Sequence, residues 1–233
     1  MKALVTGGTG LVGRYIVETL IDAGYEVAVA GRTPPAEGLF SQPVEFRPAQ
    51  LDPNWKPGAL FAGIDVFIHA AFEHLPGRYR GGEGDDPDGF RRSNLEGTVS
   101  LFNAARRAGT RHVVFLSSRA VYDGVPRGTP LTEDLTLQPT SLYGEIKLTG
   151  EQALAAMNAP DFITSSLRLT GVYGDLRPNK WDTLFADYLA GRPVPVRAGS
   201  EVHGRDVGQA VRLMLETEPD QIGAQAFNCL LYT

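Results

Sequence analysis

A tyrosine and a lysine stand four residues apart, at positions 143 and 147, near the start of a predicted helix. This spacing places both side chains on the same helical face. The ammonium group of Lys147 would stabilise the phenolate of Tyr143 and lower its pKa from a reference value of about 10. The phenol could then act as an acid or a base near neutral pH. The alternative is a half-buried tyrosine beside the stem of a lysine that reaches solvent.

A serine favours the chemical interpretation of this pair. Ser118 lies at the carboxyl end of a predicted strand, where ligands bind in open α/β sheets. Its hydroxyl could bond the substrate oxygen while Tyr143 exchanges a proton and Lys147 holds the ribose hydroxyls of a cofactor. Serine is common in turns, so Ser118 indicates little by itself. The three residues in this order, after a glycine-rich loop, indicate a catalytic group.

The glycine-rich loop occupies residues 6–13, between the first predicted strand and the first predicted helix. Gly7 permits a tight turn, Gly10 allows the backbone to approach a pyrophosphate, and Gly13 allows the helix to pack closely on the strand. The helix N-terminus supplies N–H groups and the positive end of its dipole. The spacing GxxGxxG at a strand–helix junction favours dinucleotide binding over a purely structural turn. The residues expected to contact the cofactor here are Gly7, Thr9, Gly10, Leu11, Val12 and Gly13.

The end of the second predicted strand indicates the type of dinucleotide. NAD sites usually carry an Asp or Glu there, which accepts hydrogen bonds from the ribose 2′-hydroxyl. This strand ends in Gly31 and Arg32, with no carboxylate between positions 29 and 33. Arg32 could bind a 2′-phosphate, with help from Arg14 after the last glycine, or both arginines could be solvated surface residues. We expect NADP rather than NAD, with NAD still possible.

The chemistry requires elements that bring these segments together, and the hydrophobic pattern predicts them. Short apolar, β-branched runs alternate with longer amphipathic stretches, which is typical of βαβ units and a parallel sheet. The sequence therefore predicts an α/β protein with a Rossmann-type doubly wound parallel sheet. Strands are expected at 2–6, 25–30, 44–47, 65–70, 112–117 and 162–169, and helices at 11–20, 88–108 and 138–156.

Two loops and one amphipathic segment should lie near the ligand. The loops 74–89 and 122–136 follow predicted strands and are rich in Gly, Pro and Asp, so we expect them to rim the site. The segment 181–189 is amphipathic. It is expected to form either a helix that covers the substrate or a helix that packs on the sheet.

Composition excludes several classes of protein. The chain has 233 residues, with 22 basic and 27 acidic side chains, and 42% of its residues are apolar. A net charge of −5 without a basic run argues against nucleic-acid binding and against binding to an anionic membrane. No apolar run is long enough to span a bilayer, and the first residues do not resemble a signal peptide. The single Cys229 fits a reducing cytoplasm, and His69 and His203 have no neighbours at metal-ligand spacing, so no metal is expected.

The chain resembles the extended short-chain dehydrogenases/reductases, the NAD-dependent epimerase/dehydratase group. The resemblance extends along nearly the whole chain, and it is specific for the superfamily but not for the reaction. It is carried by TGGTGLVG at 6–13, HAA at 69–71, NLEGT at 94–98, SSRAVY at 117–122, YGEIK at 143–147, LRLTGVYG at 167–174 and VHGRDV at 202–207.

The resemblance implies further cofactor contacts. Ala70 and Ala71 would line the cofactor, with Asn94 nearby. Gln50, before Leu51, stands where the family usually has an aspartate that contacts adenine. The Gln50 amide can still bond the adenine amino group, so Gln50 and Leu51 are counted among the cofactor contacts.

Departures from the family pattern concern the substrate. Relatives that act on nucleotide-diphosphate sugars often have an asparagine at the place of residues 170–171 and an arginine near residues 199–201. Glu201 would repel a diphosphate there, although nearby arginines could compensate. The dehydratase branch has an Asp-Glu pair where this chain has residues 119–120, Arg-Ala, which argues against dehydration.

The resemblance implies hydride transfer between C4 of a nicotinamide and a hydroxyl or carbonyl carbon of a sugar-like or small carbonyl substrate, with Ser118, Tyr143 and Lys147 as the catalytic group. The alternatives are a sugar epimerase that retains its cofactor and a non-catalytic protein that senses NADP or acts as a scaffold. We expect a Rossmann domain at 1–174 and a substrate-binding region at 175–233, which is small or incomplete beside that of extended relatives. Many relatives form homodimers through the helices predicted here, so a homodimer is a further expectation.

Overall fold

A seven-stranded sheet forms the centre of the computed structural model, which describes residues 1–75, 82–177, 179, 181–196 and 199–229. The strand order is β3-β2-β1-β4-β5-β6-β9, and every pairing is parallel. This order reverses between β1 and β4, as in doubly wound nucleotide-binding sheets, and it confirms the predicted fold class. The strands are β1 (Lys2–Thr6), β2 (Glu26–Gly31), β3 (Glu45–Pro48), β4 (Val66–His69), β5 (His112–Ser118), β6 (Ile163–Leu169) and β9 (Gln225–Cys229).

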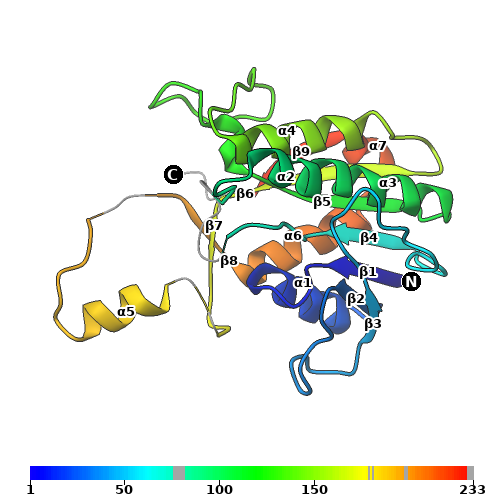
Figure 1. The fold of residues 1–233 in the computed structure, drawn as a ribbon, viewed down its shortest axis with the longest axis horizontal. Helices are drawn as coiled ribbons and strands as arrows, with labels where there is room; N and C mark the ends of the chain where they lie inside the picture. Colours follow the sequence, from blue (N-terminus) through cyan, green and yellow to red (C-terminus); the bar gives the residue numbers. More distant parts are fainter. Residues whose placement is uncertain (76–81, 178, 180, 197–198, 230–233) are drawn as a thin grey trace.

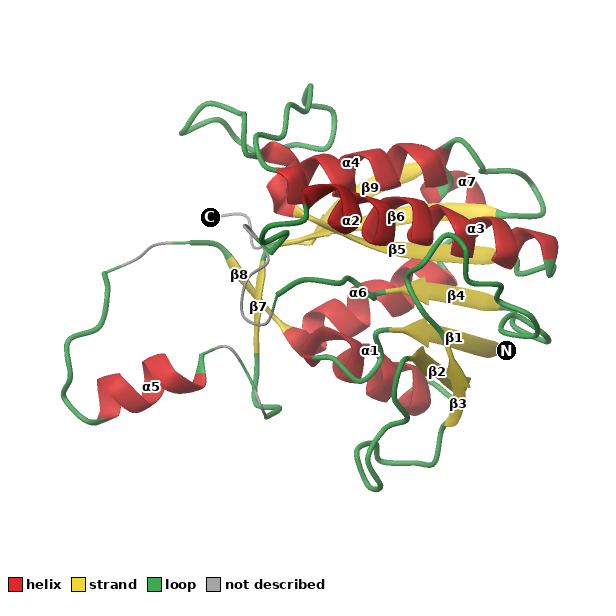
Figure 2. Cartoon of the chain, viewed as in Figure 1, coloured by secondary structure: helices red, strands yellow, loops and turns green. Residues whose placement is uncertain are grey.

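Helices cover both faces of this sheet (Figures 1 and 2). α1 (Leu11–Asp22) and α6 (Gly204–Glu216) share one apolar core with the sheet, and α3 (Thr98–Arg107) and α4 (Leu142–Ala155) share the other. The central strands are therefore buried on both sides, which explains their continuous apolar sequences. The shorter helices are α2 (Pro87–Arg91), α7 (Pro219–Ile222), the π-helix η1 (Arg92–Gly97) and the 3-10 helix η2 (Arg119–Tyr122).

Two predicted helices are confirmed with altered boundaries. The helix expected at 88–108 runs through α2, η1 and α3, and it contains a π-helical segment that the hydrophobic pattern does not show. The helix expected at 138–156 begins only at Leu142. Ser141 caps it, because its Oγ accepts the N–H of Gly144 at 3.2 Å.

The chain leaves the main sheet after β6. β7 (Gly171–Tyr173) and β8 (Glu201–His203) pair in parallel as a separate two-stranded sheet. α5 (Asp182–Leu189) lies between them in the sequence and stands away from the main sheet in Figure 1, and none of its residues is buried. The predicted amphipathic helix is thus present, but it does not pack on the main sheet.

The last helix pair and strand return to the main sheet. α6 packs on α1, and β9 pairs with β6 from Ser165 to Leu169. Among the described residues after 174, those up to β8 lie away from the main sheet, whereas α6 packs on it and β9 joins it, a pairing that the sequence did not indicate. The reason is that a strand-like pattern near the end of a chain does not show which sheet it joins. The domain division at 174 stays a prediction, and so does substrate binding by this region.

No helix in the part of the chain that the structure describes is long and apolar enough to cross a membrane. Cys229 is buried at the end of β9, and burial raises the pKa of its thiol to about 11. The thiol therefore stays protonated at neutral pH and serves as a small apolar group in the core.

Candidate active site

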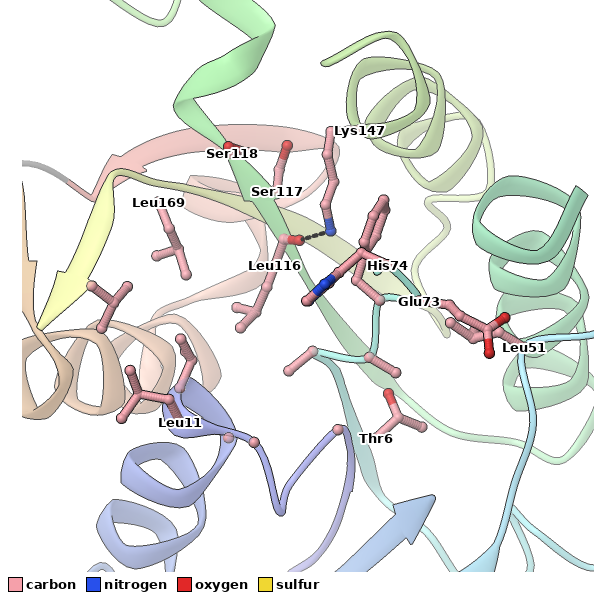
Figure 3. Close-up of a pocket in the computed structure, with 18 of the residues that line it drawn as sticks. Thr6, Leu11, Leu51, Glu73, His74, Leu116, Ser117, Ser118, Lys147 and Leu169 are labelled. Carbon is pink, nitrogen blue, oxygen red and sulfur yellow. Dashed lines mark hydrogen bonds between the residues drawn. The ribbon is translucent and has the colours of Figure 1, made fainter. Parts of the chain in front are cut away.

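A cavity of about 850 Å³ lies at the carboxyl ends of the central strands, between the glycine-rich loop and α4 (Figure 3). It opens where the strand order reverses, which is where open α/β sheets bind ligands. The predicted rim segment 122–136 does not contribute to its wall, and residues 76–81 of the other predicted loop lie outside the described residues. Of the residues predicted from the sequence, the cavity is lined by Gly7, Thr9, Gly10, Leu11, Val12, Gly13, Arg32, Gln50, Leu51, Ala70, Ala71, Ser118, Tyr143 and Lys147.

The glycine-rich loop is a cradle of backbone atoms. A β-carbon on Gly13 would collide with the carbonyl group of Gly7. Gly7 has a φ of 69°, and a β-carbon there would lie 2.8 Å from the backbone of Ala70. α1 begins immediately after Gly10, so its first N–H groups have no carbonyl partner within the helix. This arrangement can hold an anionic group such as a pyrophosphate.

Arg14 does not reach the cavity. Its side chain is buried, and its Nη1 donates a hydrogen bond of 2.6 Å to the carbonyl oxygen of Arg177. It therefore ties α1 to the segment after β7. The sequence shows that Arg14 follows the last glycine, but the hydrogen bond to Arg177, a residue distant in sequence, directs its side chain away from the cavity.

Asn94 lies behind the cavity wall and supports it. Its side-chain amide accepts the N–H of Glu73 at 2.7 Å and donates to the carbonyl oxygen of Glu73 at 2.8 Å. It also donates to the carbonyl oxygen of Phe90 at 3.0 Å, and it is 2% exposed. These bonds fix the backbone that follows Ala70 and Ala71. Asn94 therefore positions a loop that lines the cavity, although Asn94 itself does not line it.

Ser118 and Tyr143 border the cavity from β5 and α4. Ser118 ends its strand, and its Oγ accepts the N–H of Ala120 at 3.2 Å. A hydroxyl that accepts one hydrogen bond can still donate its own hydrogen to a substrate oxygen. The ring of Tyr143 packs edge-on against Phe72, with the ring centroids 5.0 Å apart. The tyrosine is thus held against the loop after β4.

Ser117 also lines the cavity, although sequence reasoning gave it no role. Its Oγ is buried and has no hydrogen-bond partner among the residues described in the structure. Burial of an unpaired hydroxyl costs free energy unless a ligand bonds it. Its position next to Ser118, at the carboxyl end of a strand, was the available signal.

Lys147 is buried below the cavity. Its Nζ donates a hydrogen bond of 2.8 Å to the carbonyl oxygen of Leu116 (Figure 3), and it lies 4.5 Å from the ring centroid of Phe72. The ring centroid of Tyr143 is 5.9 Å from Nζ, as the four-residue spacing predicts. Burial lowers the pKa of Lys147 to about 7, and the carboxylate of Glu151 acts in the opposite direction. The ammonium group therefore titrates near neutral pH.

A buried ion pair behind Lys147 was not anticipated. Arg168 of β6 donates to both carboxylate oxygens of Glu151 on α4, with Nη2 2.8 Å from Oε2. Arg168 also donates to the hydroxyl of Tyr122, which is bonded to Asn228 of β9 at 2.9 Å. These contacts join α4, β6 and β9, so they fix the helix that carries the tyrosine and the lysine. Their partners are too far apart in sequence for a local pattern to show them.

His69 is a neutral residue of the core. It is fully buried, with Nδ1 2.7 Å from Oγ1 of Thr6 and Nε2 2.9 Å from Oγ1 of Thr98. Thr98 gives its hydroxyl hydrogen to the carbonyl of Asn94, so Nε2 of His69 donates and Nδ1 accepts. Burial lowers the pKa of His69 to about 3. Within the described ranges, no group of three or more His, Cys, Asp or Glu side chains could hold a metal ion.

Comparison with known proteins finds relatives along the chain. The model of the family described as "NAD dependent epimerase/dehydratase family" matches residues 3–229. The UDP-glucose 4-epimerase of Bacillus subtilis is 34% identical over 170 residues, which are 69% of this chain and 49% of that protein. The 3 beta-hydroxysteroid dehydrogenase/Delta 5→4-isomerase of Mycobacterium tuberculosis is 32% identical over 197 residues, which are 82% of this chain and 52% of that protein. The chain thus spans about half the length of these curated relatives.

Solved structures share the fold. The UDP-glucose 4-epimerase of Thermus thermophilus, solved with NAD, matches with a TM-score of 0.81 at 27% identity, over 98% of this chain and 77% of that chain. MoeE5, solved with UDP-glucuronic acid and NAD, also gives a TM-score of 0.81, over 100% of this chain and 77% of that chain. Its identity of 24% limits that comparison to the fold.

Proposed function

The chain belongs to the NAD dependent epimerase/dehydratase family, and we propose that it is an enzyme that transfers a hydride between a nicotinamide dinucleotide and a hydroxyl or carbonyl carbon. The observation that carries the proposal is that Ser118, Tyr143 and Lys147 border the same cavity as the glycine-rich loop. A protein that only senses the dinucleotide would need the loop, but it would not need a buried lysine beside a tyrosine.

The cavity fits a dinucleotide by shape and by chemistry. The backbone cradle at Gly7 and Gly13 would hold the pyrophosphate, and Gln50 would bond the adenine. Ala70 and Ala71 would line the cofactor with small side chains. When bound, the nicotinamide ring donates or accepts the hydride.

The side chains on β5 and α4 would handle the proton and the substrate oxygen. The phenol oxygen of Tyr143 would give or take the proton. The ammonium group of Lys147 would favour the phenolate, and its hydrogens not used by Leu116 could bond the ribose hydroxyls. Ser118 would donate its hydroxyl hydrogen to the substrate oxygen. The ring of Phe72 would exclude water from one side of the phenol.

We propose NADP as the preferred dinucleotide, with NAD also bound. Arg32 lines the rim of the cavity and could bind a 2′-phosphate through its planar guanidinium. Nothing lies within 4 Å of the place of a β-carbon on Gly31, which leaves room for that group. Titration with each dinucleotide tests the preference, and tighter binding of NAD than of NADP would refute it.

We propose an uncharged alcohol or ketone as the substrate in preference to a nucleotide sugar. The carboxylate of Glu201 fills the space beside Gly171, which lines the cavity, and it would repel a diphosphate. Glu201 also borders a hollow of about 420 Å³. The wall of this hollow includes Trp181, Leu184 and Phe185, so it suits the apolar part of a substrate. Sugar epimerisation is the second candidate, because some relatives are named as UDP-glucose 4-epimerases.

The test is the Tyr143→Phe variant, assayed with NADP or NAD against a 3β-hydroxysteroid and against UDP-glucose. Turnover should fall by about 10³-fold because the proton has no carrier, while dinucleotide affinity should change little. Tyr188→Phe is the matched control, since Tyr188 is 68% exposed on α5 and does not line the cavity. Unchanged turnover in Tyr143→Phe would contradict the assignment.

The same assay separates the candidates. A net change in nicotinamide absorbance during turnover supports a dehydrogenase or reductase. Interconversion of UDP-glucose and its epimer without a net change in absorbance supports an epimerase. Tight dinucleotide binding without turnover of any substrate in a broad panel of alcohols, ketones and sugars supports a non-catalytic protein and would overturn the proposal.

A further inference from the structure

An ion pair bridges two segments of the cavity rim that are far apart in sequence. Arg32 follows β2 and Glu73 follows β4, and these two strands flank β1 in the sheet. The Nη1 of Arg32 lies 2.9 Å from Oε1 of Glu73. Both residues line the cavity, and Figure 3 shows Glu73 at the edge that Leu51 also borders. The pair therefore lies on the side of the cavity where the adenosine half of a dinucleotide would be held.

Hydrogen bonds anchor the backbone of Glu73, whereas the side chain of Arg32 is exposed. The two hydrogen bonds from Asn94 hold the N–H and the carbonyl of Glu73, and Asn94 itself is buried. The side chain of Arg32 is 74% exposed and that of Glu73 is 43% exposed. A carboxylate on an anchored backbone is therefore paired with an exposed guanidinium at the rim.

This pair supplies a feature that the local sequence lacks. In NAD sites a carboxylate usually stands at the end of the second strand, and no acidic residue lies between positions 29 and 33 here. The structure instead places the carboxylate of Glu73, from the loop after β4, 2.9 Å from Nη1 of Arg32, the residue that follows β2. A carboxylate and a phosphate use the same fork of a guanidinium, so both would compete for Arg32.

We propose that Glu73 sets the dinucleotide preference of this site. It acts as an internal anion that the 2′-phosphate of NADP must displace from Arg32, and its carboxylate provides the hydrogen-bond acceptor that suits the 2′-hydroxyl of NAD. The inference rests on the proposed function, because it assumes that the cavity binds a dinucleotide. It would allow one site to bind both dinucleotides with a modest preference.

The test compares the affinities of the full chain for NADP and for NAD by calorimetric titration, which requires no turnover. In Glu73→Gln, NADP should bind about three- to fivefold more tightly, because an exposed ion pair is weak and its loss frees Arg32. NAD should bind no more tightly than before. Glu96→Gln is the matched control, because it removes the same charge from an exposed residue that does not line the cavity.

Arg32→Gln completes the cycle. It should weaken NADP binding by about tenfold. In the double variant Arg32→Gln/Glu73→Gln, the loss of the Glu73 carboxylate should no longer improve NADP binding. The carboxylate and the 2′-phosphate compete for the guanidinium of Arg32, which this variant lacks. If Glu73→Gln leaves the ratio of affinities unchanged while Arg32→Gln lowers NADP affinity, the role of Glu73 is refuted and the proposed function stands. If the unaltered protein binds neither dinucleotide, the proposed function itself fails.

Discussion

The two walls of the cavity are built in different ways. The wall made by the glycine-rich loop and the start of α1 consists of backbone, and at Gly7 and Gly13 there is no space for a side chain. The opposite wall, made by β5 and α4, depends on buried polar side chains such as Lys147, with the ion pair of Arg168 and Glu151 behind it. The first wall therefore offers a ligand a close-fitting surface with backbone N–H groups, and the second offers it polar and charged side chains.

This difference decides how each wall can fail. The backbone wall should be sensitive to added volume and insensitive to pH, because it holds no titrating side chain. Replacement of a charged side chain in the second wall by an apolar one of similar size should leave the fold intact, but it should reduce turnover. It should also make stability depend on pH, because its buried groups have pKa values far from those of an unfolded chain.

The largest effect is expected from Lys147→Met. The variant removes the ammonium group that favours the phenolate, so turnover should fall by about 10³-fold. Methionine has a similar length, and the rings of Phe72 and Phe115 around Nζ can accommodate it, so the melting temperature should stay within a few degrees. Lys56→Met at an exposed site is the control. Turnover near that of the unaltered protein would show that the second wall does not work by charge.

A smaller effect is expected from Gly13→Ala. The added methyl group meets the carbonyl of Gly7, so the loop must shift and dinucleotide affinity should fall by about 10- to 100-fold, which corresponds to about 1–3 kcal/mol. Calorimetric titration measures the affinity and a thermal melt measures the fold. Gly199→Ala is the control, since nothing lies within 4 Å of its β-carbon position. An unchanged affinity would show that the loop is not a close-fitting cradle.

The last expected effect is a pH dependence of stability from His69, which lies in the core and outside both walls of the cavity. Burial lowers its folded-state pKa to about 3, below the value of about 6.5 in an unfolded chain. Between these values only the unfolded state takes up the proton, so this residue makes stability fall as the pH drops from 6.5 toward 3, by at most about 1.4 kcal/mol per pH unit. Denaturant unfolding at pH 7, 5.5 and 4.5 should show a shallower fall in His69→Gln.

His112 provides a useful comparison for that measurement. Burial lowers its pKa to about 4, and its ring lies at the start of β5, away from the cavity. Some pH dependence should therefore persist in the His69 variant and become weaker still when His112 is also replaced, while carboxylates with lowered pKa values such as Glu45 keep a residual slope. A slope that does not respond to either change would contradict the neutral, buried state of these rings.

Much of the fold and of the site could be predicted from local sequence. The strands β1, β2, β4 and β5 contain continuous apolar runs, and the glycine-rich loop lies at the first strand–helix junction, as its spacing indicated. Tyr143 and Lys147 share a helical face because a four-residue spacing fixes that relation in any α-helix. Arg14, by contrast, turns away to Arg177, because its direction depends on a segment more than 160 residues later.

Features that depend on short-range geometry therefore follow from the amino-acid order alone: the succession of strands and helices, the cradle of glycines, and the residues that come to the carboxyl ends of the strands. Packing between distant segments established which side chains meet across the sheet. This packing pairs β9 with β6 at the edge of the sheet and brings the carboxylate of Glu73 to Arg32. It also buries Lys147 deeply enough to lower its pKa to about 7. The physical reason is that burial and ion pairing are properties of packed surroundings, and those surroundings come from segments that no local pattern connects.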